Sequence, residues 1–164
     1  DTSSGAPYYT IGEIEFYPPS LTYGKTVVDA SEFADVYNVE KCVDGDPATY
    51  YESKALPAHI VIDLGEVCNI STIVLCLPPL LTWSPRTQKI AFYGSESKTS
   101  YTKETEFFEV IEEKEYLFDP TSGNRVTIEL SKPVSLRFFK MVITSNSNPG
   151  GYGGQVSEVS VYGA

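Results

Sequence analysis

The heptapeptide HIVIDLG, residues 59–65, alternates along its length with a period of two residues. In an extended strand such alternation sends successive side chains to opposite faces. The two faces are Ile60, Ile62 and Leu64 on one side and His59, Val61 and Asp63 on the other. The first face is entirely aliphatic, whereas the second carries two polar groups. The pattern predicts a β-strand with one face in the core and the other partly in contact with water.

The same alternation recurs along the rest of the chain. It is found in NISTIVLCLP (69–78), QKIAFYGS (88–95), NRVTIELS (124–131), LRFFKMVIT (136–144) and QVSEVSVYG (155–163). The segment TEFFEVIEEKEYLF (105–118) fits a helical period as well, but its aromatic and β-branched content favours strands. With 12 Gly and 11 Pro between such segments, the sequence predicts an all-β fold, an antiparallel two-sheet β-sandwich, with a closed barrel as the alternative.

Length and charge limit the possible functions. A chain of 164 residues fits one domain with a substantial core. Its formal net charge of −10 disfavours nucleic acid and anionic membranes as partners, because both are bound through clustered Lys and Arg. No apolar run approaches the roughly 18 residues of a membrane-spanning helix. The three cysteines, Cys42, Cys68 and Cys76, lack the spacing of zinc ligands and are expected to be buried thiols.

The N-terminal segment echoes the C-terminus. IGEIEFY (11–17) matches VSEVSVY (156–162), with Glu13 in the position of Glu158. Similar segments at such a separation indicate tandem modules. Residues 1–17 are therefore either the last strand of a preceding module or an N-terminal edge strand of this one. Residues 18–164 form the predicted domain.

The stretch KCVDGDPATYYES, residues 41–53, places Asp44 and Asp46 on either side of a glycine. An EF-hand is excluded, because Thr49 and Ala55 stand where that loop needs its glycine and its bidentate glutamate. Paired catalytic carboxylates must flank a scissile bond roughly 5–9.5 Å apart, which a single turn does not easily allow. The one histidine is not part of a nucleophile-elbow motif. A calcium site remains, since Ca²⁺ accepts carboxylate, hydroxyl and carbonyl oxygens; the alternative is an acidic surface turn without metal.

Four motifs in this order resemble those of the discoidin, or coagulation factor 5/8 C-terminal, domain superfamily: VDGDPATYYES, HIVIDLG, RTQKIAFYGS and QVSEVSVYG. Within it the chain is most similar to bacterial carbohydrate-binding modules of family 32. The resemblance covers roughly residues 20–163 and implies a galactose-binding-domain-like jelly roll with a structural Ca²⁺. The implied ligands are the side chains of Asp44, Asp46, Thr49 and Glu158, with carbonyls of Lys41 or Cys42 and of Ser157.

The resemblance also implies a sugar site in the loops at one end of the sandwich. PPLLTWSPRT (78–87) holds Trp83, the expected stacking platform, and Arg86, the expected donor to sugar hydroxyls. The alternatives are that Trp83 is a core indole and that Arg86 pairs with a nearby carboxylate. In SNSNPGGYGGQ (145–155), Tyr152 lies between glycines, and Asn148, like Asn146, offers hydrogen bonds.

Three residues of an earlier loop complete the predicted site or border it. Tyr37 and Glu52 are expected to join the same end of the sandwich as the tryptophan loop. Tyr51 is instead expected to pack in the core, because many members of the superfamily carry tryptophan at that position.

The function that the resemblance implies is non-catalytic binding of carbohydrate. The chain would be a module of a larger secreted bacterial glycoside hydrolase, linked to catalytic and sister modules, and would be extracellular, either secreted or at the cell surface. The expected ligand is a terminal galactose or N-acetylgalactosamine, with an α-glucan as the second choice. Two other classes stay open: an enzyme, which would need convergent titratable groups in a cleft, and an adhesion domain for protein or lipid.

Overall fold

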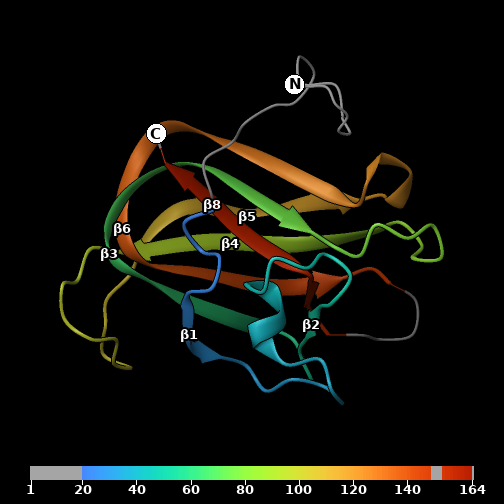
Figure 1. The fold of residues 1–164 in the computed structure, drawn as a ribbon, viewed down its shortest axis with the longest axis horizontal. Helices are drawn as coiled ribbons and strands as arrows, with labels where there is room; N and C mark the ends of the chain where they lie inside the picture. The colour runs from blue at the N-terminus through green and yellow to red at the C-terminus, as the bar shows by residue number, and fades with distance from the viewer. Residues whose placement is uncertain (1–19, 149–152, 164) are drawn as a thin grey trace, which may run out of the picture.

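The computed structural model describes residues 20–148 and 153–163, so both the N-terminal segment 1–17 and Tyr152 lie outside the described residues. The described residues form strands and two short 3₁₀ turns (Figure 1). In order these are β1 (Thr26–Ala30), η2 (Val39–Cys42), β2 (Tyr51–Glu52), β3 (Ala58–Cys76), β4 (Arg86–Ser95), β5 (Phe108–Phe118), η3 (Pro120–Ser122), β6 (Arg125–Asn146), β7 (Gln155–Val156) and β8 (Glu158–Gly163).

Strand β3 contains HIVIDLG, and its side chains are buried as the alternation predicts. Ile60, Ile62 and Leu64 are at most 2% exposed, whereas His59 and Asp63 are half-buried. Val61 is also fully buried. The strand therefore has one wholly apolar face and a second face that is only partly accessible to water.

Strands β3 and β6 each join two segments that the sequence predicted as separate strands. The first part of β3, up to Asp63, pairs with β1 and with residues 138–143 of β6. The second part, from Cys68, pairs with β8 and with residues 125–136 of β6. The ladder shifts register between Asp63 and Cys68, and Gly65 has a φ of +90° there. Both strands curve around one side of the molecule and so belong to two layers (Figure 1).

The two layers form the predicted antiparallel sandwich. One has the strand order β1, β3, β6, β4, β5, and in the other β8 and the early part of β6 flank the late part of β3. A separate two-stranded ribbon pairs β2 with β7. The core between the layers is aliphatic and aromatic, with Leu75, Phe92, Phe139 and Val161 among its fully buried members.

The remaining predictions are confirmed in part. Segment 105–118 contains a strand, β5, whereas β1 and β2 were not predicted. All three cysteines are free thiols, but only Cys42 is fully buried, and Cys68 and Cys76 are half-buried at the ends of ladders. In the part of the chain that the structure describes, no helix is long and apolar enough to cross a membrane.

Candidate functional site

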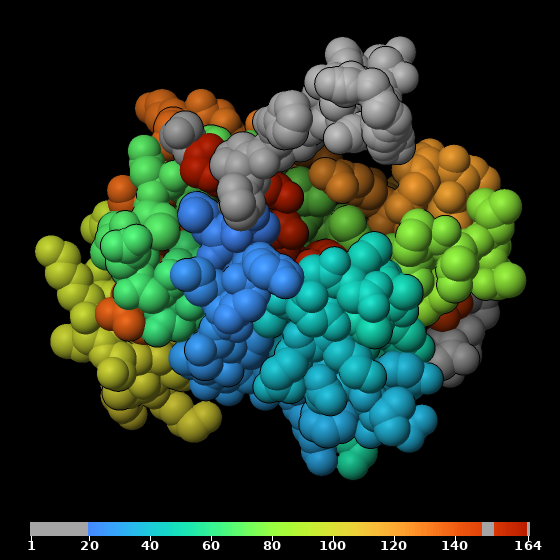
Figure 2. All heavy atoms as spheres, viewed as in Figure 1, coloured from blue at the N-terminus to red at the C-terminus, as the bar shows by residue number. Residues whose placement is uncertain are grey.

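A pocket of about 440 Å³ opens among the loops at one end of the sandwich. The loop before β4, drawn light green, and the blue-to-cyan loops around β2 meet at this end (Figure 2). The lining residues are Tyr37, Tyr50, Glu52, Thr82, Trp83, Ser84, Arg86, Asn148 and Gln155. Five of the six residues predicted for the sugar site are therefore brought together, and the sixth is Tyr152, which is not described. The other four lining residues, Tyr50, Thr82, Ser84 and Gln155, were not predicted.

Three aromatic rings form one wall of the pocket. Tyr37 and Tyr50 stack with their centroids 4.5 Å apart and their planes at 17°. Trp83 meets Tyr50 edge-on, at 4.8 Å and 89°. The amide of Trp83 donates to the carbonyl of Leu80, which closes the turn that carries the indole. Trp83 packs partly against the core but is only half-buried, so it is neither a core indole nor an isolated platform.

Arg86 was predicted to lie in the loop, but it is the first residue of β4. Its side chain is only 5% exposed. Its guanidinium lies over the Trp83 ring, 4.7 Å from the centroid, which is a cation–π contact. Nη1 donates to Oε1 of Gln155 at 2.7 Å, and Nε donates to the carbonyl of Ser84 at 3.1 Å. The amide oxygen of Gln155 is thus one hydrogen-bond partner of this guanidinium.

A buried polar network forms the floor beneath these rings. Nε2 of Gln155 donates to Oε1 of Glu52 at 3.2 Å, and Nδ2 of Asn146 donates to Oε1 of Gln155 at 3.1 Å. The backbone of Gln155 exchanges two 2.9 Å hydrogen bonds with the amide of Gln88. Because Glu52, Gln88 and Gln155 are all buried, the amide bridge holds the carboxylate and the guanidinium of Arg86 in fixed orientations. All three of Glu52, Arg86 and Gln155 line the pocket.

Two predicted neighbours of the pocket differ in role. Asn148 lines it, and the side chain of Asn146 accepts the Asn148 amide at 2.9 Å, which fixes the start of the loop after β6. Tyr51 is fully buried, and its hydroxyl donates to the carbonyl of Ser31 at 2.8 Å. The prediction that Tyr51 packs in the core is confirmed.

The acidic loop is held by its own side chains. Oδ1 of Asp44 accepts the amide of Asp46 at 2.9 Å, and its Oδ2 accepts the hydroxyl of Thr49 at 2.5 Å. Oδ1 of Asp46 accepts the amide of Ala48 at 2.9 Å. Gly45 between them has a φ of +77° and lies so close to the Tyr23 ring that a Cβ there would be 2.5 Å from Cε1. The turn therefore favours glycine for its backbone, and a larger residue would also have to displace the exposed ring of Tyr23.

Glu158, at the start of β8, meets this loop from the other end of the chain. Its Oε2 is buried and has no hydrogen-bond partner among the described residues, and the same holds for the hydroxyl of the preceding Ser157. Burial, followed by the hydrogen bond and the charge of Asp44, raises the pKa of Glu158 to about 8. The pKa of the Cys42 thiol is also raised, first by burial and then by the charges of Glu158 and Asp44. Acidic side chains are therefore close together where Glu158 meets the loop of Asp44 and Asp46.

The predicted calcium ligands are thus only partly assembled from side chains. Over residues 20–148 and 153–163, no three His, Cys, Asp or Glu side chains are grouped so as to hold a metal ion. Lys41 turns its ammonium to the carbonyl of Val36, at 3.0 Å. A cation at Asp44 and Glu158 would have to draw further oxygens from carbonyls, which Ca²⁺ accepts. Oε2 of Glu158, which has no hydrogen-bond partner among the described residues, is available as a carboxylate ligand to such a cation.

Comparison with known proteins gives a family match and several solved structures with a similar fold. The family model of the F5/8 type C domain matches residues 27–159. No curated protein is similar enough in sequence to match. Among solved structures, chitosan-binding module 2 of a chitosanase/glucanase from Paenibacillus sp. IK-5, in complex with chitotriose, is 23% identical with a TM-score of 0.65, over 87% of this chain and 99% of that one.

Two further structures share the fold. The family 32 module of NanJ from C. perfringens, in complex with galactose, is 16% identical with a TM-score of 0.65, over 88% of this chain and 98% of that one. SpGH29 is 16% identical with a TM-score of 0.66, over 88% of this chain but 28% of its own. In that protein the matching domain is one part of a longer chain.

Proposed function

The chain belongs to the F5/8 type C, or discoidin, domain family, and we propose that it is a non-catalytic module that binds carbohydrate in the pocket beside Trp83. The observation that carries this proposal is the pairing of an aromatic wall with a buried polar floor. A sugar presents an apolar C–H face and a ring of hydroxyls, and the pocket offers a surface for each. The NanJ and chitosan-binding modules, which share the fold, are described in complex with sugars.

The absence of a catalytic role is part of the proposal. Of the described residues that line the pocket, Glu52 is the one carboxylate. Glycoside hydrolysis ordinarily uses two carboxyl groups that flank the bond to be cleaved. We therefore assign binding rather than turnover to this pocket, as a module of a longer extracellular bacterial glycoside hydrolase. The match of this fold to 28% of the SpGH29 chain supports such an arrangement.

Two classes of ligand are proposed for the test. A terminal galactose-configured sugar is the first, and the galactose complex of the NanJ module supports it. An amino sugar is the second, because Glu52 is only 6% exposed and forms no ion pair among the described residues, so a protonated amine would offset its buried charge. The chitotriose complex supports this second class. The Kd is expected on the order of micromolar to millimolar for so shallow a site.

The acidic loop is the proposed site of a structural Ca²⁺. The ligands would be the side chains of Asp44, Asp46, Thr49 and Glu158 with carbonyls of Lys41 or Cys42 and of Ser157. The crowding of Asp44 and Glu158, with one buried carboxylate oxygen lacking a partner, supports a cation there. Its role would be to tie the loop after η2 to the start of β8 rather than to contact the sugar.

A glycan array followed by calorimetric titration tests the proposed function. The array should include galactose, N-acetylgalactosamine, chitotriose and maltotriose. The best ligand should lose about tenfold or more in affinity with Trp83→Ala and with Arg86→Ala. Leu81→Ala is the matched control, because Leu81 lies in the same loop, is 76% exposed and does not line the pocket. Equal binding by all four proteins, or no binding to any glycan, would reject the proposal.

A further inference from the structure

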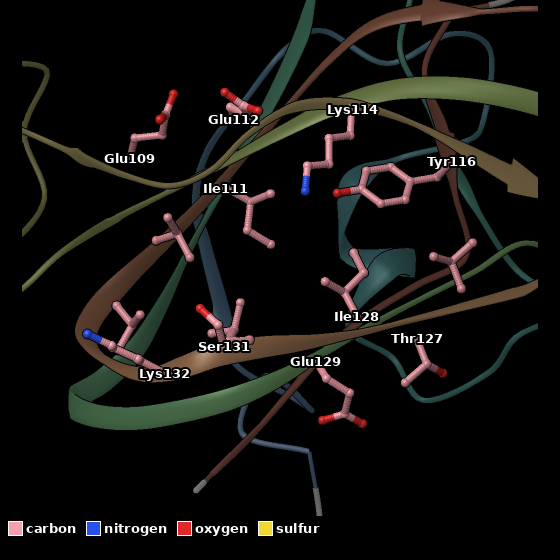
Figure 3. Close-up of a pocket in the computed structure, with 14 residues that line it drawn as sticks. Glu109, Ile111, Glu112, Lys114, Tyr116, Thr127, Ile128, Glu129, Ser131 and Lys132 are labelled. Carbon is pink, nitrogen blue, oxygen red and sulfur yellow. The ribbon is translucent and has the colours of Figure 1, made fainter.

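A larger groove, of about 720 Å³, lies away from the loop pocket, between β5 and the early part of β6. Val110, Ile111 and Tyr116 project from β5, and Val126, Ile128 and Leu130 are among those that line the other side. These side chains pack against the core with their inner ends and are only half-buried. Figure 3 shows Ile111 and Tyr116 facing Ile128 across the open space, with Glu109, Glu112 and Lys132 at the margins.

Each side of the groove is a strand edge that pairs with no further strand among the described residues. β5 is the last strand of its layer and pairs only with β4. Residues 125–134 of β6 pair only with β3, whereas β4 pairs with the later part of the strand. Each edge therefore presents backbone N–H and C=O groups, and an added strand is the partner that such edges accept.

The hydroxyl of Tyr116 is a second sign that something is missing from the groove. Its oxygen is buried without a hydrogen-bond partner in the part of the chain that the structure describes. Burial also raises the pKa of this tyrosine, so it remains a protonated donor. A buried donor without an acceptor costs free energy. Figure 3 shows the Tyr116 ring on the β5 side of the groove, next to where a peptide paired with β5 would lie.

The charge of the groove selects the kind of peptide. The charged residues that line the groove are Glu109, Glu112 and Glu129 against Lys114 and Lys132, and β5 also carries Glu113 and Glu115 outside the lining. Lysine or arginine on one face of an added strand would meet these carboxylates, while apolar residues on its other face would cover Ile111 and Ile128. We propose that this groove binds an extended peptide segment with alternating apolar and basic residues, which adds as a strand alongside β5.

The proposal is tested by NMR titration of the full chain, 1–164, with a synthetic peptide. The peptide is roughly ten residues long, to match β5, and alternates lysine with valine or threonine. The expected result is saturable change in the amide signals of β5 and of residues 125–134, and in the ring signals of Tyr116. A peptide of the same sequence with alternate amides N-methylated keeps its charge but loses strand donors, and it should not bind.

Two variants and one control separate strand addition from charge attraction. Tyr116→Phe should weaken binding about threefold, the effect of one hydrogen bond, without lowering the melting temperature. Ile111→Lys should weaken it about tenfold or more through the loss of an apolar contact and through repulsion. Val67→Lys adds the same charge at another partly exposed position, in the bend of β3, and should leave binding nearly unchanged.

Three results would overturn the proposal. The first is binding that persists after N-methylation or that falls equally with Val67→Lys, since this would be diffuse attraction to an acidic protein. The second is signal changes confined to the loop pocket. The third is contact between residues 11–17, or a second copy of the chain, and β5 in the peptide-free sample, because the groove would then be occupied already.

Discussion

Gln155 connects the two charged side chains of the pocket. One end of its amide accepts from Arg86 and the other donates to Glu52, and all three side chains are at most 6% exposed. A buried charge that loses a hydrogen-bond partner is more costly than the bond itself was favourable. The orientation of both charged groups therefore depends on a residue that has no charge of its own.

Gln155→Met keeps the volume of this side chain and removes the bridge. We expect the free energy of unfolding to fall by about 1–3 kcal/mol and the affinity for the best glycan to fall about tenfold, as measured by urea unfolding and calorimetry. Asn148→Ala is the matched control, since Asn148 lines the pocket outside the bridge. It should change affinity with little effect on stability. A Gln155→Met protein with unchanged stability would show that the bridge is not structural.

Asp63 and Arg137 form a two-pronged ion pair beside the bend of β3. Nε donates to Oδ1 at 2.8 Å and Nη2 donates to Oδ2 at 3.0 Å, and the amide of Gly65 also donates to Oδ1. The hydrogen bond from Arg137 is the main reason why the pKa of Asp63 is lowered. Because the folded state favours the charged form, this contribution is present above the unfolded pKa, about 3.9, and is lost as pH falls through the lower folded value.

Asp63→Asn should therefore lower the melting temperature by a few degrees at pH 7. The gap between variant and wild type should begin to close as the pH falls below about 4, the unfolded pKa, and should disappear as the pH falls through the lower pKa of folded Asp63. Thermal melts from pH 7 down to pH 2.5 check this. A gap that stays constant over that range would mean that the charge of Asp63 contributes nothing.

At the level of the strand, the bend of β3 lets one segment serve both layers. Gly65 adopts a φ of +90° at the bend, a conformation that other residues enter at a cost of roughly 1–2 kcal/mol. Open space surrounds its Cα, so the cost of a side chain there is conformational and not steric. The ladder to β6 shifts its register across this bend.

Gly65→Ala should lower the free energy of unfolding by about 1–2 kcal/mol without changing the fold. Gly163→Ala is the control, because Gly163 ends β8 without a positive φ and its nearest contact for a Cβ would be an ordinary 3.6 Å. Chemical unfolding of both variants measures the difference. Equal stabilities would contradict a role for the left-handed backbone at residue 65.

Periodicity predicted the strands well and their connections poorly. The alternation in 59–65 and 69–78 is a local property and was sufficient to place both halves of β3. That they form one strand depends on a hydrogen-bond ladder to β6, about 70 residues away in sequence, which no local pattern records. β1 and β2 were missed because TVVDA has only two β-branched apolar residues and YE is two residues long.

In the pocket, too, locally recognisable residues were predicted and residues placed by strand pairing were not. Rings and charges in loops rich in proline and glycine were recognisable, so Trp83, Arg86 and Tyr37 were found. Gln155 was missed because a polar residue at the start of a strand is ordinarily exposed at the strand end and has no role in a site. Only the pairing of β2 with β7 sets it opposite Glu52. The one signal for it in the sequence is that a glutamine directly precedes a segment of mostly buried residues.

For the molecule as a whole, the proposed Ca²⁺ would join the loop after η2 to β8, two segments more than a hundred residues apart. Addition of Ca²⁺ to a hundred times its Kd should stabilise the fold by about 2.7 kcal/mol and raise the melting temperature by several degrees. Glu158→Gln should abolish this response while leaving the metal-free protein at least as stable, since it relieves the crowding with Asp44. Identical melting curves in chelator and in Ca²⁺ would reject the site.

The central claim is that sugar binds between the aromatic wall and the amide floor of the loop pocket. NMR titration with the best glycan from the array tests it most directly. The account predicts that the largest signal changes will be those of the Trp83 indole and of the side-chain amide of Gln155, with β5 and residues 125–134 unaffected. Changes centred on the groove between β5 and β6, or none at the indole, would contradict it.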